Sequence, residues 1–136
     1  MSKFLNTTAL VINKRKKREG DILVTLFTES LGKINCISKG AQSLKSRRLG
    51  HLENGNIIKV SLYEKDSYFW LTESETLVPF IKSASPTLSQ INLLFYFLEI
   101  LNALVPSEQI QSDLYLLATD SVKAISQNSF AVFIQN

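Results

Sequence analysis

The sequence predicts an α+β protein in which five antiparallel strands come first and an α-helical segment follows. Apolar and polar residues alternate from Thr8 to Leu77, and a helical period replaces this alternation after Pro79. The five strands are short and occupy about 75 residues, with the longest interruption between the third and the fourth. This is the pattern of a five-stranded antiparallel Greek-key β-barrel of the OB type, with an SH3-like barrel as the alternative.

Each predicted strand is rich in β-branched and aromatic residues and is bounded by Gly, Asp, Asn or Ser. The five runs are TALVIN (8–13), DILVTLFT (21–28), GKINCIS (32–38), NIIKVSLYE (56–64) and YFWLTESETL (68–77). The segment EKDS (64–67) predicts a short hairpin connection, and KRKKREG (14–20) predicts a longer basic turn that ends in Gly20. We therefore expect the barrel domain to occupy residues 1–80.

The remaining residues, 81–136, predict a helical segment. A first helix is expected over 85–106, with Ser85 as its N-cap, Pro86 at the first helical position and Pro106 after its end. A second helix follows over 107–126 with Ser107 as its cap, and 128–136 begins a third. Because the first helix is apolar nearly all round, it must be covered on several sides. We expect either a truncated helical domain of a longer protein or self-association.

Several classes of function have no support in the sequence. Cys36 is the single cysteine, which excludes disulfide and cysteine-ligated zinc frameworks within the chain. His51 is the single histidine and has no partner for general acid-base chemistry, and no P-loop, nucleophile dyad or metal-spaced cluster is present. We expect a protein that is not an enzyme, has no catalytic residue, and uses no metal or cofactor. Near the N-terminus the basic cluster follows the apolar stretch, which is the reverse of a secretory signal, and no apolar run reaches the ~20 residues that a membrane span needs. We therefore expect a cytoplasmic location.

Positive charge is concentrated in one part of the chain. Residues 14–48 hold ten Lys and Arg residues against three acids, a local charge of +7, whereas the whole chain carries +3. This segregation predicts one positively charged face and a polyanionic partner.

The cations fall in two predicted connections, the basic turn and the long loop between the third and fourth strands. Gly40 and Gly50 in that loop allow close approach of the backbone to a ligand, and Arg can bind phosphate through two hydrogen bonds. The predicted phosphate-binding residues are Lys14, Arg15, Lys16, Lys17, Arg18, Lys39, Lys45, Arg47 and Arg48. A solvated surface loop and a docking site for an acidic protein are the alternatives for these segments.

Four aromatic residues could stack on nucleic-acid bases: Tyr63, Tyr68, Phe69 and Trp70. On the fifth strand, alternation places Phe69 and Leu71 on one face and Tyr68 and Trp70 on the other. We expect the first face to be core and choose Tyr68 and Trp70 as the stacking residues. Without directional base-edge contacts, binding is expected to be nearly independent of base sequence.

Four segments in order resemble the bacterial RecO recombination mediators: EGDILVTLFTESLGK (19–33), SKGAQSLKSR (38–47), LE (52–53) and LTESETLVPF (71–80). The resemblance spans roughly residues 8–105. It implies an N-terminal OB fold, a following helical domain, and binding of single- and double-stranded DNA in the cytoplasm, associated with the nucleoid. It also implies annealing of strands coated by single-stranded DNA-binding protein, and loading of RecA together with RecR.

This chain departs from the family pattern in three ways. It is shorter than typical members, it lacks their four-cysteine zinc site, and LENG follows the basic loop where LEPF is more usual. Two other functions stay open: an RNA-binding OB module, and a scaffold whose basic loops receive acidic peptides.

Overall fold

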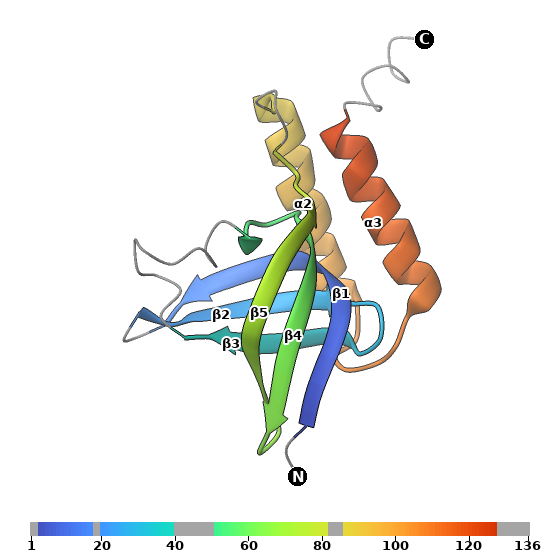
Figure 1. Cartoon of the computed structure of the whole chain (residues 1–136). Coiled ribbons are helices and arrows are strands. Elements are labelled where there is room, and N and C mark those ends of the chain that lie inside the picture. Colours follow the sequence, from blue (N-terminus) through green and yellow to red (C-terminus); the bar gives the residue numbers. More distant parts are fainter. Residues whose placement is uncertain (1–2, 18–19, 40–50, 82–85, 128–136) are drawn as a thin grey trace.

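A computed structural model describes residues 3–17, 20–39, 51–81 and 86–127 of the chain. Figure 1 shows the strands wrapped into a barrel and the helices lying side by side against one part of it. The elements are β1 (Lys3–Lys16), β2 (Ile22–Thr28), β3 (Gly32–Ser38), β4 (Ile57–Lys65), β5 (Tyr68–Val78), α2 (Leu88–Leu104) and α3 (Ser112–Ser126). The five-strand prediction and the α+β class are confirmed.

The strands close into a barrel in the order β1-β2-β3-β5-β4, which is consistent with an OB-type domain. The long strand β1 pairs with two neighbours, since its first half lies against β4 and its second half against β2. The pairing of β1 with β2 shifts its register at a bulge between Val11 and Asn13. Bulges bend a strand, so this one allows β1 to turn from one side of the barrel to the other.

One strand pair contradicts the expectation of a purely antiparallel sheet. Strands β3 and β5 are parallel, with Cys36 opposite Phe69 and Ile37 opposite Trp70. The reason is that β4 starts beside β1, on the far side of the barrel from β3, and the hairpin then returns β5 alongside β3 in the same direction. The barrel is therefore mixed, with four antiparallel pairs and one parallel pair.

The predicted basic turn is wrong for its first three residues. Lys14, Arg15 and Lys16 belong to β1, because they pair with Val24, Leu23 and Ile22. The connection to β2 is correspondingly short, and the backbone N–H of Lys17 donates to the carbonyl of Asp21 at 2.8 Å. At its other end β1 begins at Lys3, five residues before the predicted start, because residues 3–10 pair with β4.

Two apolar cores hold the structure together. The first fills the barrel, where Val24, Leu26 and Leu62 are fully buried. The second joins the outer surface of β1 and β2 to the helices, and here the rings of Phe27 and Tyr115 meet edge to face at 5.5 Å. The helices thus cover one part of the barrel exterior. The second core contains residues from both predicted domains, 1–80 and 81–136. The division into two domains stays a prediction.

Both helices start later than predicted. The N-cap of α2 is Thr87 instead of Ser85, because Thr87 and Gln90 form a capping box. The helix α3 starts at Ser112, since Ser107 instead pairs with Lys33 in a parallel bridge. Ser85 and the third helix expected over 128–136 lie outside the described residues.

The apolar character of α2 is only partly covered. Leu94, Leu98 and Leu101 are buried, whereas Leu88 and Leu104 are 73% and 76% exposed. Truncation or self-association as the reason stays a prediction. Neither helix in the described ranges combines the length and the apolar character needed to cross a bilayer.

Candidate nucleic-acid interface

The ends of three strands bring two predicted basic segments to one edge of the barrel. Lys16 at the end of β1 pairs with Ile22, and Ile22 pairs in turn with Ser38 at the end of β3. The residues that follow, Lys17 and Lys39, are exposed. The end of β1, the start of β2 and the end of β3 therefore lie at the same edge of the barrel (Figure 1), with Lys17 and Lys39 beside them. Arg18, Lys45, Arg47 and Arg48 lie outside the described residues.

The cations at the end of β1 differ in their surroundings. Lys14 Nζ lies 2.9 Å from Oε1 of Glu53, and the Lys14 side chain is 24% exposed. Arg15 and Lys16, the next two residues, are exposed. Because a carboxylate neutralises the first of these cations, Arg15 and Lys16 are better placed to meet phosphates.

Lys39 and Trp70 form a cation–π contact on the outside of the barrel. The Nζ atom of Lys39 lies 5.2 Å from the centre of the Trp70 ring. The parallel pairing explains the contact, since Ile37 lies opposite Trp70 and Lys39 follows two residues later on the same face. A predicted phosphate-binding residue and a predicted stacking residue are thus brought together.

A shallow groove of about 450 Å³ surrounds this contact. It is lined by Lys39, Tyr63, Lys65, Asp66, Tyr68 and Trp70. The alternation predicted for β5 is confirmed, since Phe69 and Leu71 are buried at 7% and 4% exposure and Tyr68 is 60% exposed. The groove therefore combines aromatic rings with two lysines, which is the chemistry used to hold single-stranded nucleic acids.

Sequence reasoning missed two members of this surface, Phe4 and Lys65. Phe4 lies in the part of β1 that the pattern did not reveal, where its ring packs against Tyr63. Lys65 ends β4 and pairs with Tyr68 across the hairpin. The available signal was the alternation of Tyr63 and Lys65 along β4, which places both on the outer face with Tyr68 and Trp70.

Farther along β4 and β5 the surface changes sign. A second groove of about 630 Å³ is lined by Asn6, Lys59, Ser61, Thr72, Glu73, Ser74 and Glu75. Its two carboxylates, Glu73 and Glu75, outnumber its one cation, Lys59, so the groove as a whole would repel a phosphate backbone. The surface favourable to nucleic acid is therefore bounded on this side.

The single histidine has a structural environment. The backbone N–H of Thr76 donates to His51 Nδ1 at 3.2 Å, and the Thr76 hydroxyl lies 2.6 Å from the same nitrogen. The His51 carbonyl also accepts from Asn56 Nδ2 at 3.2 Å. These bonds fix the start of the segment 51–56 on β5. Among the residues in the described ranges, no group of His, Cys, Asp and Glu could hold a metal ion.

Comparisons with known proteins agree on one family. The model of the family described as Recombination protein O N terminal matches residues 1–80. The chain is 28% identical over 125 residues to the DNA repair protein RecO of Thermoanaerobacter sp. (strain X514), covering 92% of this chain and 50% of that protein. It is 34% identical over 107 residues to the DNA repair protein RecO of Clostridium novyi (strain NT), covering 79% and 41% respectively. The chain thus spans about half the length of the curated relatives that it matches.

Proposed function

The chain belongs to the RecO family of recombination proteins, and from this premise we propose that it is a DNA-binding module of a repair and recombination mediator. It binds single- and double-stranded DNA without a chemical step. The relatives named above are DNA repair proteins, which supports the assignment of DNA as the ligand. The observation that carries the proposal is the shared barrel edge. Lys16 pairs with Ile22 there, Ile22 pairs with Ser38, and Lys39 directly follows Ser38.

The contacts of this edge suit a phosphate backbone. Arg15, Lys16, Lys17 and Lys39 are exposed at the ends of β1 and β3, the two strands that flank β2. Arg18, Lys45, Arg47 and Arg48 lie outside the described residues and stay predicted phosphate contacts. Because such a surface neutralises phosphates irrespective of the bases, it binds both DNA forms and lessens the repulsion between two strands. Annealing of complementary strands follows from that reduced repulsion.

The family assignment supports a wider role that we include in the proposal. The whole protein would anneal strands coated by single-stranded DNA-binding protein and, together with RecR, promote the loading of RecA. The partners would therefore be DNA, RecR and single-stranded DNA-binding protein, and RecA indirectly. The same role would place the protein on the nucleoid in the cytoplasm.

A salt titration tests the proposal. Binding of labelled single- and double-stranded oligonucleotides is measured by fluorescence anisotropy between about 50 and about 200 mM salt. Contacts with four to six phosphates should give a slope of log K against log salt of roughly −3 to −5. Absence of binding to either DNA form at the lowest salt would contradict the proposal, and a strong preference for a matched RNA would favour an RNA-binding module.

A matched pair of double variants assigns the surface. Arg15→Ala with Lys39→Ala removes two cations from the barrel edge, and the slope should become less steep by roughly 1.4 to 1.8. Lys59→Ala with Lys123→Ala removes the same charge from β4 and α3 and should leave the slope nearly unchanged. Equal effects of the two variants would show that net charge, and not this edge, governs binding. If the first variant alone loses the capture of an acidic peptide while its DNA binding stays intact, the result would favour a scaffold that binds acidic peptides.

A further inference from the structure

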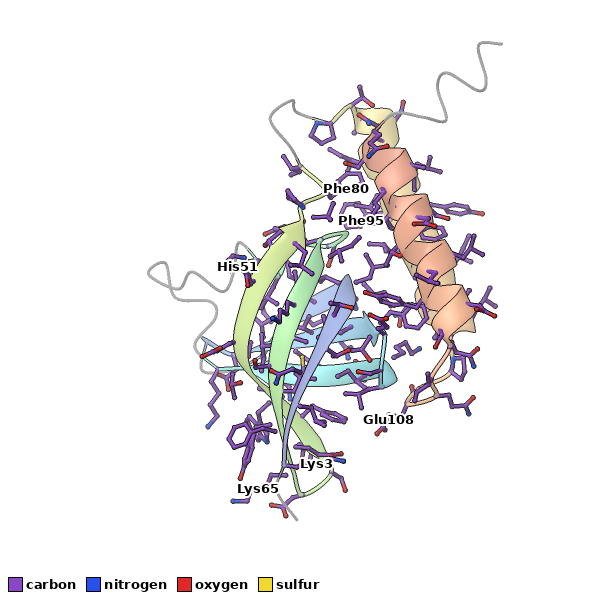
Figure 2. The ribbon with its side chains drawn as sticks, turned by 45° about the vertical axis from the view of Figure 1, so that its right-hand side comes forward. Lys3, His51, Lys65, Phe80, Phe95 and Glu108 are labelled. Carbon is purple, nitrogen blue, oxygen red and sulfur yellow. The ribbon has the colours of Figure 1, made fainter. Side chains whose placement is uncertain are left out.

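An aromatic pair lies on the outside of the barrel, at the end that carries the β4–β5 hairpin. The rings of Phe4 and Tyr63 have their centres 4.9 Å apart and are inclined at 40°. Phe4 is 74% exposed, although its neighbour Leu5 packs against the barrel core. Figure 2 shows the flanking residues Lys3 and Lys65 at this end of the molecule, well away from Phe80 and Phe95 near the helices.

This pair continues into a row that crosses four strands. Phe4 on β1 lies opposite Tyr63 on β4, Tyr63 opposite Trp70 on β5, and Trp70 opposite Ile37 on β3. The row faces outward, because the adjacent residues Leu62, Leu71 and Cys36 are buried in the barrel core. Tyr68 extends the aromatic surface at the hairpin, where it is 60% exposed.

Phe4, Tyr63 and Trp70, the rings of this row, belong to neither apolar core. The second core, which packs the helices on the barrel, contains none of these residues. Large aromatic side chains that form a contiguous patch on a protein surface commonly mark a binding site, because soluble proteins rarely leave such a patch in contact with water. Lys39 and Lys65 lie in the same groove, against one acid, Asp66. Rings beside cations are suited to a ligand that has both flat faces and negative charge.

We propose that Phe4, Tyr63, Tyr68 and Trp70 form a base-stacking platform for single-stranded DNA. This inference rests on the proposed function and names the DNA form that this part of the surface takes. Unpaired bases expose their flat faces and stack on the rings, while Lys39 and Lys65 meet the adjoining phosphates. In a duplex both faces of each base are already stacked, so a duplex can use the lysines but not the rings.

The charge pattern indicates the course of the strand across the platform. Glu73 and Glu75 line the next groove along β4 and β5 and disfavour a path in that direction. A path across the strands, from Phe4 through Tyr63 and Trp70 towards Lys39, instead leads to the cationic barrel edge. The platform and the edge would therefore hold one continuous single strand.

The test uses the fluorescence of Trp70, which is the single tryptophan of the chain. The protein is titrated with a thymidine oligonucleotide, an abasic oligonucleotide of the same length and a blunt duplex, with binding followed in parallel by anisotropy. Stacking should quench Trp70 on binding the thymidine strand. The abasic strand has the same phosphates but no bases and should bind more weakly, with little quenching.

Variants identify the rings involved. Phe4→Ala and Tyr63→Ala should each weaken binding of the thymidine strand by roughly fivefold or more, and should change duplex binding by less than about twofold. Tyr96→Ala is the matched control, because Tyr96 is a 65% exposed tyrosine on α2. Phe4→Ala removes a largely exposed ring, and circular dichroism checks that both barrel variants keep the fold.

The outcomes separate the two proposals. Equal affinity for thymidine and abasic strands, with unchanged Trp70 fluorescence and unchanged affinity of the Phe4 variant, would overturn the platform but leave the DNA-binding function standing. Absence of binding to all three oligonucleotides would overturn both. Loss of duplex and single-strand binding to the same extent in the Phe4 variant would also overturn the platform.

Discussion

The ammonium group of Lys14 is held by the carboxylate of Glu53, with 2.9 Å between Nζ and Oε1. Glu53 is positioned by its neighbour Leu52, which is fully buried in the barrel core. Lys14 in turn pairs with Val24, whose side chain also lies in that core. The ion pair therefore ties β1 to the segment that precedes β4, and it makes Lys14 different from the cations beside it.

Substitution of Lys14 and of Arg15 should separate stability from DNA binding. Lys14→Ala breaks the ion pair and should lower the free energy of unfolding by about 0.2 to 1 kcal/mol, since Glu53 is half exposed to solvent. Arg15→Ala should leave stability nearly unchanged and make the salt slope for single-stranded DNA less steep by about 0.7. Urea unfolding and anisotropy measure the two effects. A larger loss of DNA binding from Lys14→Ala than from Arg15→Ala would contradict this assignment.

The features that the sequence predicts correctly are those that depend on interactions between residues close together in the chain. The bounds of β3, residues 32–38, agree with the structure because Gly32 and the residues after Ser38 punctuate a clear alternation. The separation of Phe69 from Tyr68 and Trp70 was also predictable, because neighbouring residues of a strand point to opposite faces. Thr87 and Ser85 are both good N-caps, and only the Gln90 side chain of the capping box decides between them.

Features that depend on distant residues could not be predicted in this way. The parallel pairing of Ile37 with Trp70 depends on where β4 joins the barrel, which no local period encodes. The Lys14–Glu53 pair joins residues 39 positions apart. The position of Phe4 on the surface was not predicted, because the alternation rule places apolar residues in the core, whereas this ring lies outside the barrel. These long-range contacts form a substantial part of the candidate site.

Gly32 should be intolerant of any side chain. Its φ is +76°, and a Cβ atom there would lie 2.1 Å from the backbone oxygen of Gln109. The strained backbone and the steric overlap with Gln109 both act against Gly32→Ala. The substitution should lower the free energy of unfolding, measured with urea, by at least roughly 3 kcal/mol. The substitution would push the connection between α2 and α3 away from β3.

Gly20→Ala is the matched control for this prediction. Gly20 also has a positive φ of +81°, but a Cβ atom there would meet nothing within 4 Å. Only the backbone cost of roughly 1 to 2 kcal/mol should remain. Equal losses from the two substitutions would show that the close approach of Gln109 has no energetic weight.

The buried thiol of Cys36 should be unreactive in the folded protein. Burial raises its pKa from the ordinary value of 9.0 to about 12. The unfolded chain ionises first as the pH rises, so this group favours folding fully below pH 9.0, and its contribution declines between pH 9.0 and about 12. A thiol reagent at pH 8 should label the protein only after denaturation, and Cys36→Ala should show a smaller loss of stability at high pH. Rapid labelling of the native protein would contradict this prediction.

The hairpin that joins β4 to β5 is expected to contain removable backbone strain. Asp66 and Ser67 have φ values of 52° and 67°, as in a two-residue turn that favours Asn-Gly or Asp-Gly. Ser67→Gly removes the steric cost of a positive φ and should raise the free energy of unfolding by roughly 0.5 to 1 kcal/mol, after the entropic cost of glycine is subtracted. Urea unfolding measures the gain, and Ser61→Gly within β4 is a control that should lower stability instead. Because neither ring of the Tyr63–Trp70 pair changes, affinity for single-stranded DNA should be kept, and a loss of both stability and affinity would show that Ser67 supports the groove directly.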